Sequence, residues 1–258
     1  MKKFLLTLEY DGTAYAGWQS QKNATTIQGT LEQSLSKLIT GGKDHIHVEG
    51  CSRTDAGVHA LGYKAVFMAE TSIPGDKICY AINSFLPKDI TARSSEEVDP
   101  DFHPRHDVIS KIYRYVILNR VFSSPVLKNR AWLVRKTLDT QKMSEAASYY
   151  TGTHDFSAFM AAGGYSKNFT RTILRSEISC SVFSGDPLIT FEIEGDGFLY
   201  NMVRIMAGTL VYAGLGKIEP VNIPEIIDGK NRNDAGLTAP AQGLYLYDVH
   251  FLNKKASS

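Results

Sequence analysis

The chain has 258 residues, of which 43% are hydrophobic and 21% are charged, and its formal net charge is +1. This composition is ordinary for a globular protein, and a chain of this length can bury a sizeable core without disulfides or structural metals. Because the net charge is close to zero, a polyanionic partner would have to bind at a local basic patch.

Cysteine usage and the lengths of the apolar runs indicate the compartment. The three cysteines, Cys51, Cys79 and Cys180, lie far apart and form no CxxC pair, which is typical of reduced thiols in a cytoplasmic protein. The N-terminal segment lacks the apolar stretch of a signal peptide, and no uninterrupted apolar run is long enough to span a membrane. We therefore expect a cytoplasmic protein with no membrane partner.

The first half of the chain predicts the element order β-α-β-β-α-β. Residues 3–10 alternate as in a half-buried strand, and apolar residues at helical spacing follow over residues 26–40. Thr25 and Gln28 resemble a capping box at the start of that helix, and Phe85 is expected on the buried face of a second helix. The other predicted elements are strands at 45–49, 60–69 and 89–94 and a helix after Pro74 and Gly75.

The second half predicts the same order of elements. Residues 111–118 alternate, which places Tyr113, Tyr115 and Ile117 on one face of a strand. A helix at 140–151, strands near 172–183 and 187–194, a helix at about 201–213 and a final strand at 245–251 follow. Each half has the split βαβ pattern of a ferredoxin-like domain. We predict an α+β fold with two such halves, residues 1–102 with a reactive loop and residues 103–258 with a basic segment.

Basic residues are concentrated between positions 103 and 136, where Asp107 is the only acid. They are Arg105, Lys111, Arg114, Arg120, Lys128, Arg130, Arg135 and Lys136. Such side chains neutralise phosphates, and the interleaved aromatic rings, such as Tyr113 and Trp132, suit stacking on unpaired bases. An ordinary solvated face is the competing interpretation. The acids between positions 96 and 101 predict a solvated connector between the two halves.

The segment with the densest reactive chemistry is the loop at residues 50–60, between two predicted strands. It places Arg53, Thr54 and Asp55 at consecutive positions, flanked by glycines that permit unusual backbone angles. A carboxylate on such a loop can act as a nucleophile or as a general base. An Asx-turn, in which Asp55 only bonds its own backbone, accounts for the local sequence equally well.

A metal site is the alternative chemistry. His45 and His47 would share one strand face, with Cys51 and His59 close by in sequence, so a metal-dependent hydrolase is one competing function. The spacing of these residues fits no common zinc pattern. The sequence also contains no GxGxxG, P-loop or GxSxG motif.

The loop GCSRTDAGVHALG closely resembles the catalytic loop of the tRNA pseudouridine synthase A family. Further segments that resemble this family, in the family's order and across almost the whole chain, are EYDGTAYAGWQ (9–19), FHPRHDVISKIYRYVI (102–117), GFLYNMVRIMAGTL (197–210) and APAQGLYL (239–246). The resemblance implies two ferredoxin-like halves forming one extended, mainly antiparallel sheet with helices on one face.

The same resemblance implies an activity and a set of site residues. It implies isomerisation of uridine to pseudouridine in the anticodon stem-loop of tRNA, at positions 38, 39 and 40, by a homodimer with no metal and no organic cofactor. Asp55 matches the family's essential aspartate, Arg53 the arginine beside it, Tyr113 the active-site tyrosine and Arg204 the late arginine that pairs with the aspartate. Substrate contacts are expected from Tyr113, Arg105, Arg114, His59 and Lys111.

Two residues depart from the family pattern. Many members have glycine where this chain has Ser52, and glutamine where it has Tyr63. Neither departure changes Asp55, so the expectation of activity stands.

The expected Asp55–Arg204 pair has a physical motive. Arg204 lies in an apolar stretch, and a cation there is costly to bury unless a carboxylate meets it. A snorkelling arginine whose head reaches solvent is the alternative. The remaining functional alternative is a non-catalytic ferredoxin-like RNA-binding protein, which would not need Asp55 and would be expected to show the aromatic RNP motif that this sequence lacks.

Overall fold

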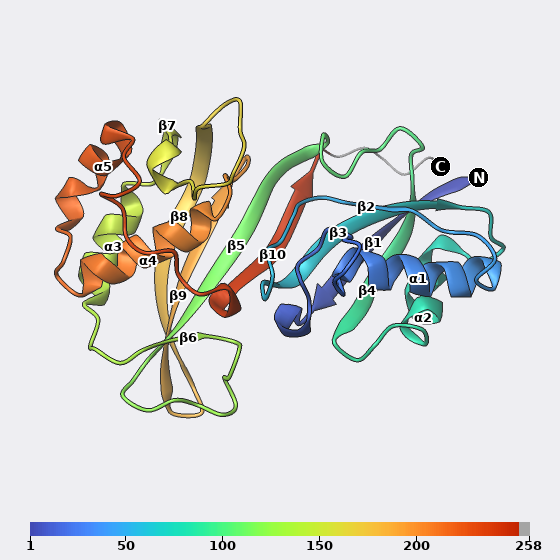
Figure 1. Ribbon diagram of the computed structural model, residues 1–258, viewed down its shortest axis with the longest axis horizontal. Helices are drawn as coiled ribbons and strands as arrows, with labels where there is room; N and C mark the ends of the chain where they lie inside the picture. Colours follow the sequence, from blue (N-terminus) through green and yellow to red (C-terminus); the bar gives the residue numbers. More distant parts are fainter. Residues whose placement is uncertain (253–258) are drawn as a thin grey trace. The chain divides into compact units, whose positions relative to one another are not determined.

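The computed structural model describes residues 1–252, which form two compact units (Figure 1). The first unit comprises residues 1–109 and 245–252, and the second comprises residues 110–244. The described residues contain ten strands, which pair mainly antiparallel within each unit, and five α-helices. The predicted α+β fold class is confirmed.

The first unit contains the strands and helices of the N-terminal half together with the last strand. They are β1 (Lys2–Tyr10), α1 (Ile27–Thr40), β2 (Val48–Gly50), β3 (His59–Ala69), α2 (Ile78–Asn83), β4 (Ile90–Val98) and β10 (Leu244–Phe251). The hydrogen-bonded order is β4-β1-β3-β10, and β2 also pairs with β3. All of these pairs are antiparallel except that of β10 with β3.

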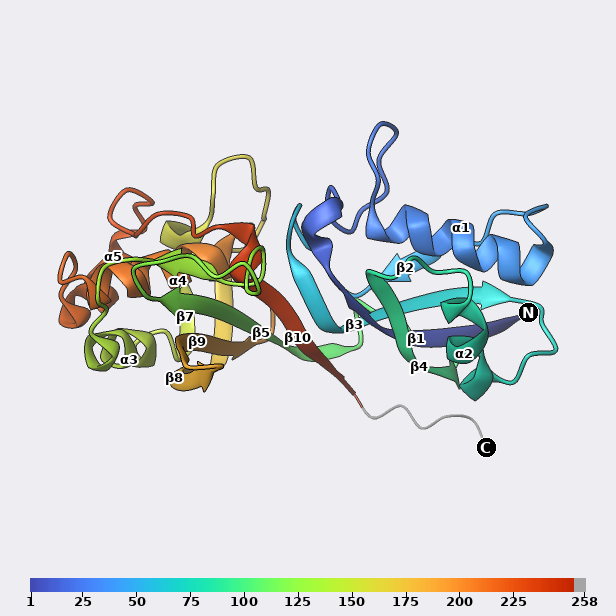
Figure 2. The same cartoon turned by 90° about the horizontal axis from the view of Figure 1, so that it is seen from below.

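Alternation along β1 builds the core of this unit. Phe4, Leu6 and Leu8 point to one face and are fully buried, and α1 and α2 lie in contact with each other in the same unit (Figures 1 and 2). Leu5 points to the other face, where it packs with Val66 and other apolar residues in a second, smaller cluster. Both faces of β1 are therefore covered. Successive residues of a strand point to opposite faces, and β1 carries apolar residues on each of them.

Several sequence predictions for this unit were wrong in detail. The N-cap of α1 is Thr26, not Thr25, because the Thr26 hydroxyl oxygen accepts a hydrogen bond from the Gly29 amide at 3.2 Å. Phe85 is exposed rather than buried, because α2 ends at Asn83 before reaching it. The acids Glu96 and Glu97 belong to β4 rather than to a connector, and both are exposed on this strand, which lies at the edge of the sheet.

The second unit has the predicted strands and helices and three short additions. Its elements are β5 (Val108–Asn119), β6 (Trp132–Val134), α3 (Thr140–Ser148), β7 (Gly152–Asp155), β8 (Thr170–Phe183), β9 (Asp186–Gly195), α4 (Met202–Gly214) and α5 (Ile223–Gly229). The strand order is β5-β9-β8-β7, all antiparallel, and β6 pairs parallel with β5. The sequence reading missed β6, β7 and α5 because elements this short show no measurable periodicity.

Helix α4 forms the centre of the second unit. Eleven of its residues are buried, and it packs against α3, which in turn contacts β8 (Figure 2). Gly208 allows close packing, since a Cβ there would lie 1.8 Å from the Leu237 carbonyl oxygen. None of the helices within residues 1–252 is both long and apolar enough to cross a membrane.

Candidate active site

Asp55 lies in the loop that joins β2 to β3 in the first unit. The loop turns at residues 56–57, where the Val58 amide donates to the Asp55 carbonyl oxygen at 3.1 Å and Gly57 has a φ of +77°. A positive φ is disfavoured for residues with a Cβ, which explains a glycine at this position. Asp55 is half-buried and Arg53 is exposed, so the cation lies nearer to solvent than the carboxylate.

The segment that follows β1 holds the Asp55 loop in place by its backbone. The Trp18 amide donates to the Thr54 carbonyl oxygen at 3.0 Å, and the Gly57 amide donates to the Tyr15 carbonyl oxygen at 3.4 Å. The Thr54 hydroxyl is buried and lies 2.8 Å from the Tyr10 hydroxyl. The loop is therefore attached on both sides of Asp55, which restricts the positions its carboxylate can take.

Two glycines of this supporting segment allow the close approach. A Cβ on Gly12 would lie 2.0 Å from the Val58 carbonyl oxygen, and a Cβ on Gly17 would lie 2.5 Å from the Thr54 carbonyl oxygen. Gly17 also has a φ of +95°. Any side chain at either position would displace the backbone that carries Asp55, so the segment EYDGTAYAGWQ and the Asp55 loop are complementary in shape.

Ser52 and Tyr63, the two residues that depart from the family pattern, contact each other. The Tyr63 hydroxyl donates to the Ser52 carbonyl oxygen, and the Ser52 amide lies 3.5 Å from the same hydroxyl. The Tyr63 ring is fully buried and stacks on Trp18 with ring centroids 4.0 Å apart. Tyr63 therefore joins the start of the Asp55 loop to the supporting segment.

Two of the expected substrate-binding residues lie next to this loop. The Arg105 Nε donates to the carbonyl oxygen of Gly50, directly before the loop, at 2.9 Å. His59 is 2% exposed, accepts a hydrogen bond from the Gly12 amide on Nδ1 at 3.1 Å, and stacks on Tyr245. Arg105 therefore presents an exposed cation beside the loop, whereas His59 is buried where the loop enters β3.

The second unit carries the other two residues that the resemblance assigns to catalysis. Tyr113, on β5, is 7% exposed and meets Phe198 edge to face, with ring centroids 5.1 Å apart. Arg204, on α4, is half-buried, and its Nε and Nη1 donate to the Ala239 carbonyl oxygen and to Asn201 Oδ1, each at 2.7 Å. Asn201 directly precedes α4 in a left-handed conformation, a role the sequence reading did not assign to it.

The surroundings of Arg204 include a buried tyrosine. The Tyr115 hydroxyl donates to the Pro240 carbonyl oxygen at 2.7 Å, directly after the residue that accepts from Arg204. Burial raises the pKa of Tyr115 well above its usual value, and the charge of Arg204 lowers it by a smaller amount. Tyr115 therefore stays protonated at neutral pH and acts as a hydrogen-bond donor that fixes the 239–240 segment.

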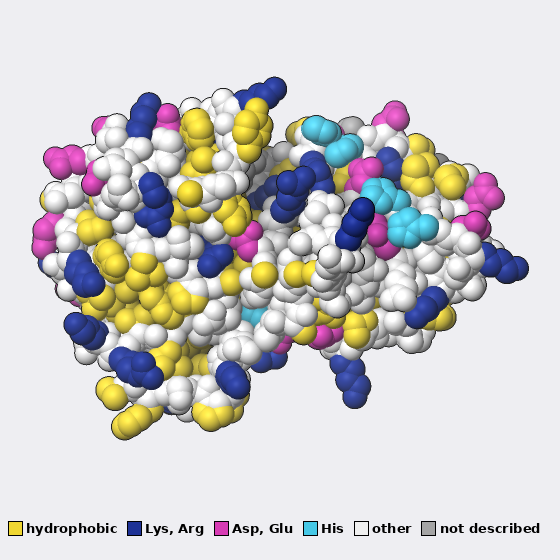
Figure 3. Space-filling view, in the orientation of Figure 1, with side chains coloured by type: hydrophobic (Ala, Val, Ile, Leu, Met, Phe, Trp, Pro, Cys, Tyr) yellow, Lys and Arg dark blue, Asp and Glu magenta, His cyan; other side chains and the backbone are white. Residues whose placement is uncertain are grey.

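Acids from β9 neutralise part of the basic segment. The register pairs Arg114 with Glu192, and the two side chains form an ion pair that Arg175 joins at 2.6 Å from Glu192. Arg120 forms an ion pair with Asp186. Lys111, also on β5, is half-buried. Figure 3 shows Lys and Arg side chains dispersed over the visible face of the second unit rather than gathered in one patch.

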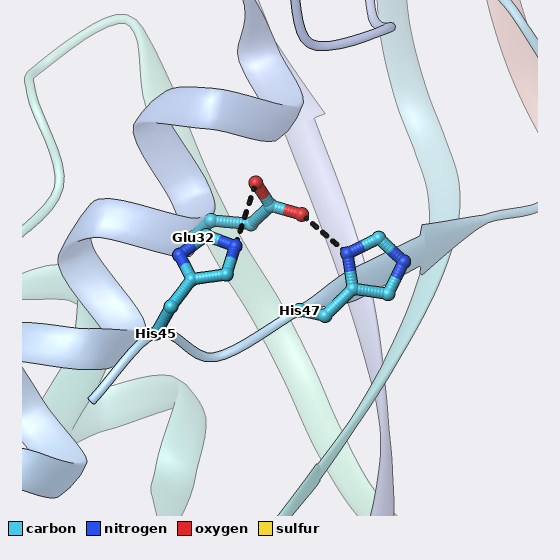
Figure 4. Close-up of side chains that lie close together, drawn as sticks. All are labelled: Glu32, His45 and His47. Atoms are coloured by element: carbon cyan, nitrogen blue, oxygen red, sulfur yellow. Dashed lines mark ion pairs between the residues drawn. The ribbon is translucent and has the colours of Figure 1, made fainter.

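The two histidines of the suggested metal site lie together, but with a different third residue. His45 and His47 both approach Glu32 of α1, as Figure 4 shows, whereas Cys51 is buried elsewhere in the loop and His59 packs against Tyr245. The sequence reading missed Glu32. The sequence feature that could have pointed to Glu32 is an acidic residue one helical turn after Gln28, on the buried face of α1.

Comparison with known proteins identifies the family. The family model described as tRNA pseudouridine synthase matches residues 7–107 and 146–252. A tRNA pseudouridine synthase A from Ruminiclostridium cellulolyticum and one from Acetivibrio thermocellus are each 50% identical over 251 residues, 97% of this chain and 100% of each relative. A third, from Thermoanaerobacter sp., is 45% identical over 249 residues, 96% of this chain and 99% of the relative. The chain belongs to the tRNA pseudouridine synthase family of isomerases.

Proposed function

We propose that this isomerase forms pseudouridine at positions 38, 39 and 40 in the anticodon stem-loop of tRNA, and that Asp55 is its essential carboxylate. The observation that carries the proposal is the attachment of the Asp55 loop, whose backbone bonds to Tyr15 and Trp18 on both sides of the aspartate. A carboxylate held by backbone rather than by flexible side chains is preorganised for chemistry.

The reaction needs only a positioned carboxylate. In the conversion of uridine to pseudouridine the N1–C1′ bond breaks, the base rotates and a C5–C1′ bond forms, while the hydrogen lost from C5 is balanced by one gained on N1. Nothing is oxidised and no group is added, so we expect no cofactor. An ionised Asp55 beside the ribose serves attack on C1′, attack on C6 or removal of a ribose proton equally well.

Arg53, Tyr113 and Arg204 have separate roles in this proposal. The target base must leave the stack, which costs a few kcal/mol, and the exposed Arg53 is suited to fill the space it leaves. Tyr113 stacks on the flipped uracil and supplies a hydroxyl for a proton step. Arg204 pairs with Asp55 and keeps it ionised.

The geometry of Arg204 supports that last role. The hydrogen bonds to the Ala239 carbonyl oxygen and to Asn201 Oδ1 fix the plane of the Arg204 guanidinium. A fixed plane suits the two-pronged contact that arginine makes with a carboxylate. The alternative, an arginine head that reaches solvent, would not need these two anchors.

We further propose that tRNA binds along the basic segment, with Arg105, Lys111 and Arg130 as phosphate contacts, and that the active form is a cytoplasmic homodimer. Arg105 supports the first part because its guanidinium lies against Gly50 at the start of the Asp55 loop. Sedimentation at micromolar concentration should give twice the chain mass of 28.5 kDa. A monomer under those conditions would contradict the dimer.

The decisive experiment maps the product. Unmodified tRNA is incubated with the purified protein, and pseudouridine is located at single-nucleotide resolution. We expect modification at positions 38, 39 and 40 and none with Asp55→Asn. Binding of tRNA without any pseudouridine would favour a non-catalytic RNA-binding protein, and modification outside the anticodon stem-loop would contradict the proposed positions.

A further inference from the structure

Glu32, His45 and His47 form a compact group in the first unit, hereafter the His-His-Glu cluster. We propose that this cluster binds a divalent transition-metal cation of the Zn²⁺ class. The proposal assigns the cation no part in the isomerisation, so it is independent of the proposed function. It rests on the geometry, the burial and the hydrogen bonding of the three side chains.

The spacing of the ligand atoms suits one small cation. His45 Nε2 lies 3.6 Å from Glu32 Oε2, His47 Nδ1 lies 3.1 Å from Glu32 Oε1, and the three ligand atoms fall within 4.8 Å of one another. Tetrahedral Zn²⁺ with bonds of about 2.0–2.1 Å has ligand atoms about 3.3 Å apart. Small rotations of the two exposed rings would therefore bring all three atoms into one coordination sphere.

The local chain explains how the two histidines meet. They flank Ile46, which is 8% exposed, in the segment that leads into β2, and the burial along it alternates between exposed and buried. Residues two apart in an extended chain point to the same side, so burying Ile46 turns both imidazoles outward together. Figure 4 shows both rings reaching the Glu32 carboxylate from this segment, while Glu32 comes from α1.

Glu32 is oriented as metal ligands are. Its side chain is 6% exposed, and Oε1 accepts hydrogen bonds from Gln28 Nε2 at 3.0 Å and from the Val48 amide at 3.1 Å. These donors fix the carboxylate and leave Oε2 directed toward His45, which is the outer-shell support typical of metal sites. Both donors are neutral, and within residues 1–252 no Lys or Arg pairs with Glu32. A divalent cation would neutralise this buried charge.

The ligand set selects the class of cation. Imidazole nitrogens suit Zn²⁺, Cu²⁺, Ni²⁺ and Fe²⁺, whereas Mg²⁺ and Ca²⁺ require oxygen ligands. Two histidines and one glutamate leave a fourth position for water. The side chains of His45 and His47 are each 67% exposed, which gives the ion a direct path from solvent. A bound ion would link α1 to the segment before β2.

The test is zinc binding by the full chain after removal of metal with a chelator. Every protein in the series carries Cys180→Ser, because the exposed Cys180 thiol would itself bind zinc. The site variant is His45→Asn with His47→Asn, which keeps polar side chains beside Glu32 but removes both imidazoles. The matched control is His103→Asn with His106→Asn, a second histidine pair with ring centroids 4.2 Å apart that lies beside Glu49.

We expect one Zn²⁺ per chain and a zinc-dependent rise in Tm for the reference protein and for the control. The site variant should bind at least about tenfold more weakly, since even outer-shell changes cost metal sites about 10–100-fold in affinity. Equal Tm values without zinc would show that all variants fold. If the double site variant does not fold, the single variant His47→Asn replaces it in the zinc titration. Equal zinc affinity in the site variant, or no zinc binding by the reference protein, would overturn the proposal.

Discussion

The Asp55 loop and the basic segment at residues 103–136 differ in the contacts that they make in the folded protein. Backbone hydrogen bonds on both sides of Asp55 hold its loop in place. The absence of a Cβ at Gly12 and Gly17 allows the close approach of the supporting segment. In the basic segment, Arg114 and Arg120 face Glu192 and Asp186, which β9 brings alongside. The fold therefore gives the Asp55 loop a defined backbone position, whereas it pairs two cations of the basic segment with acids of β9.

The largest effect is expected from Asp55→Asn. The amide has the shape of the carboxylate but is neither basic nor nucleophilic, so turnover should fall to below a few per cent of the original. Because the loop is held by its backbone, folding and tRNA binding should change little. Single-turnover kinetics and a binding titration measure the two properties separately. Activity above a few per cent would remove Asp55 as the catalytic group.

Arg204→Lys should lower the rate by about 10²-fold, the loss typical of a catalytic group displaced by about 1 Å, and leave tRNA binding nearly unchanged. Lysine keeps the charge but loses the planar two-pronged contact. The matched control is Arg232→Lys, since Arg232 also bonds the neighbouring segment, through the Gly236 carbonyl oxygen at 2.9 Å. Weaker binding with normal single-turnover chemistry would place Arg204 on the RNA rather than on Asp55.

Gly17→Ala tests whether close backbone approach positions the Asp55 loop. The substitution places a Cβ 2.5 Å from the Thr54 carbonyl oxygen at a residue with a φ of +95°. Gly41→Ala is the control, because Gly41 also has a positive φ but no neighbouring atom within 4 Å. The control should lose about 1–2 kcal/mol of stability from backbone strain alone.

Gly17→Ala should lose more stability than this control in chemical denaturation, and its rate should fall as well. The rate should be measured where both variants are fully folded. Equal losses of stability, with activity intact in both variants, would show that the supporting segment does not position the loop.

The smallest effects concern the salt dependence of tRNA binding. Arg130 is exposed, and Arg114 is half-buried beside Glu192, with which it forms an ion pair. If Arg130 contacts phosphate, Arg130→Ala should reduce the slope of log K against log salt by about 0.7–0.9, and Arg114→Ala should reduce it by less because its charge is already offset. If Arg114→Ala reduced the slope more than Arg130→Ala, RNA would have to replace Glu192 as the partner of Arg114.

Periodicity predicted the long elements of both units. Strand β1, helix α1 and helix α4 lie within one or two residues of their predicted bounds, because each is long enough to show its alternation or helical spacing. The short elements β6, β7 and α5 depend on their neighbours rather than on local pattern, so the sequence reading missed them. The prediction that Phe85 is buried was wrong because it assumed that helix α2 continues beyond its end at Asn83.

The sequence by itself determined the fold class, the family and the one loop in which a carboxylate follows a cation and a hydroxyl, because these depend on local pattern and short motifs. Only the tertiary structure decided which distant residues meet. Glu32 joins His45 and His47, Tyr63 contacts Ser52, and Glu192 pairs with Arg114. Such contacts follow from strand register and from the packing of helix against sheet, which no local stretch of sequence encodes.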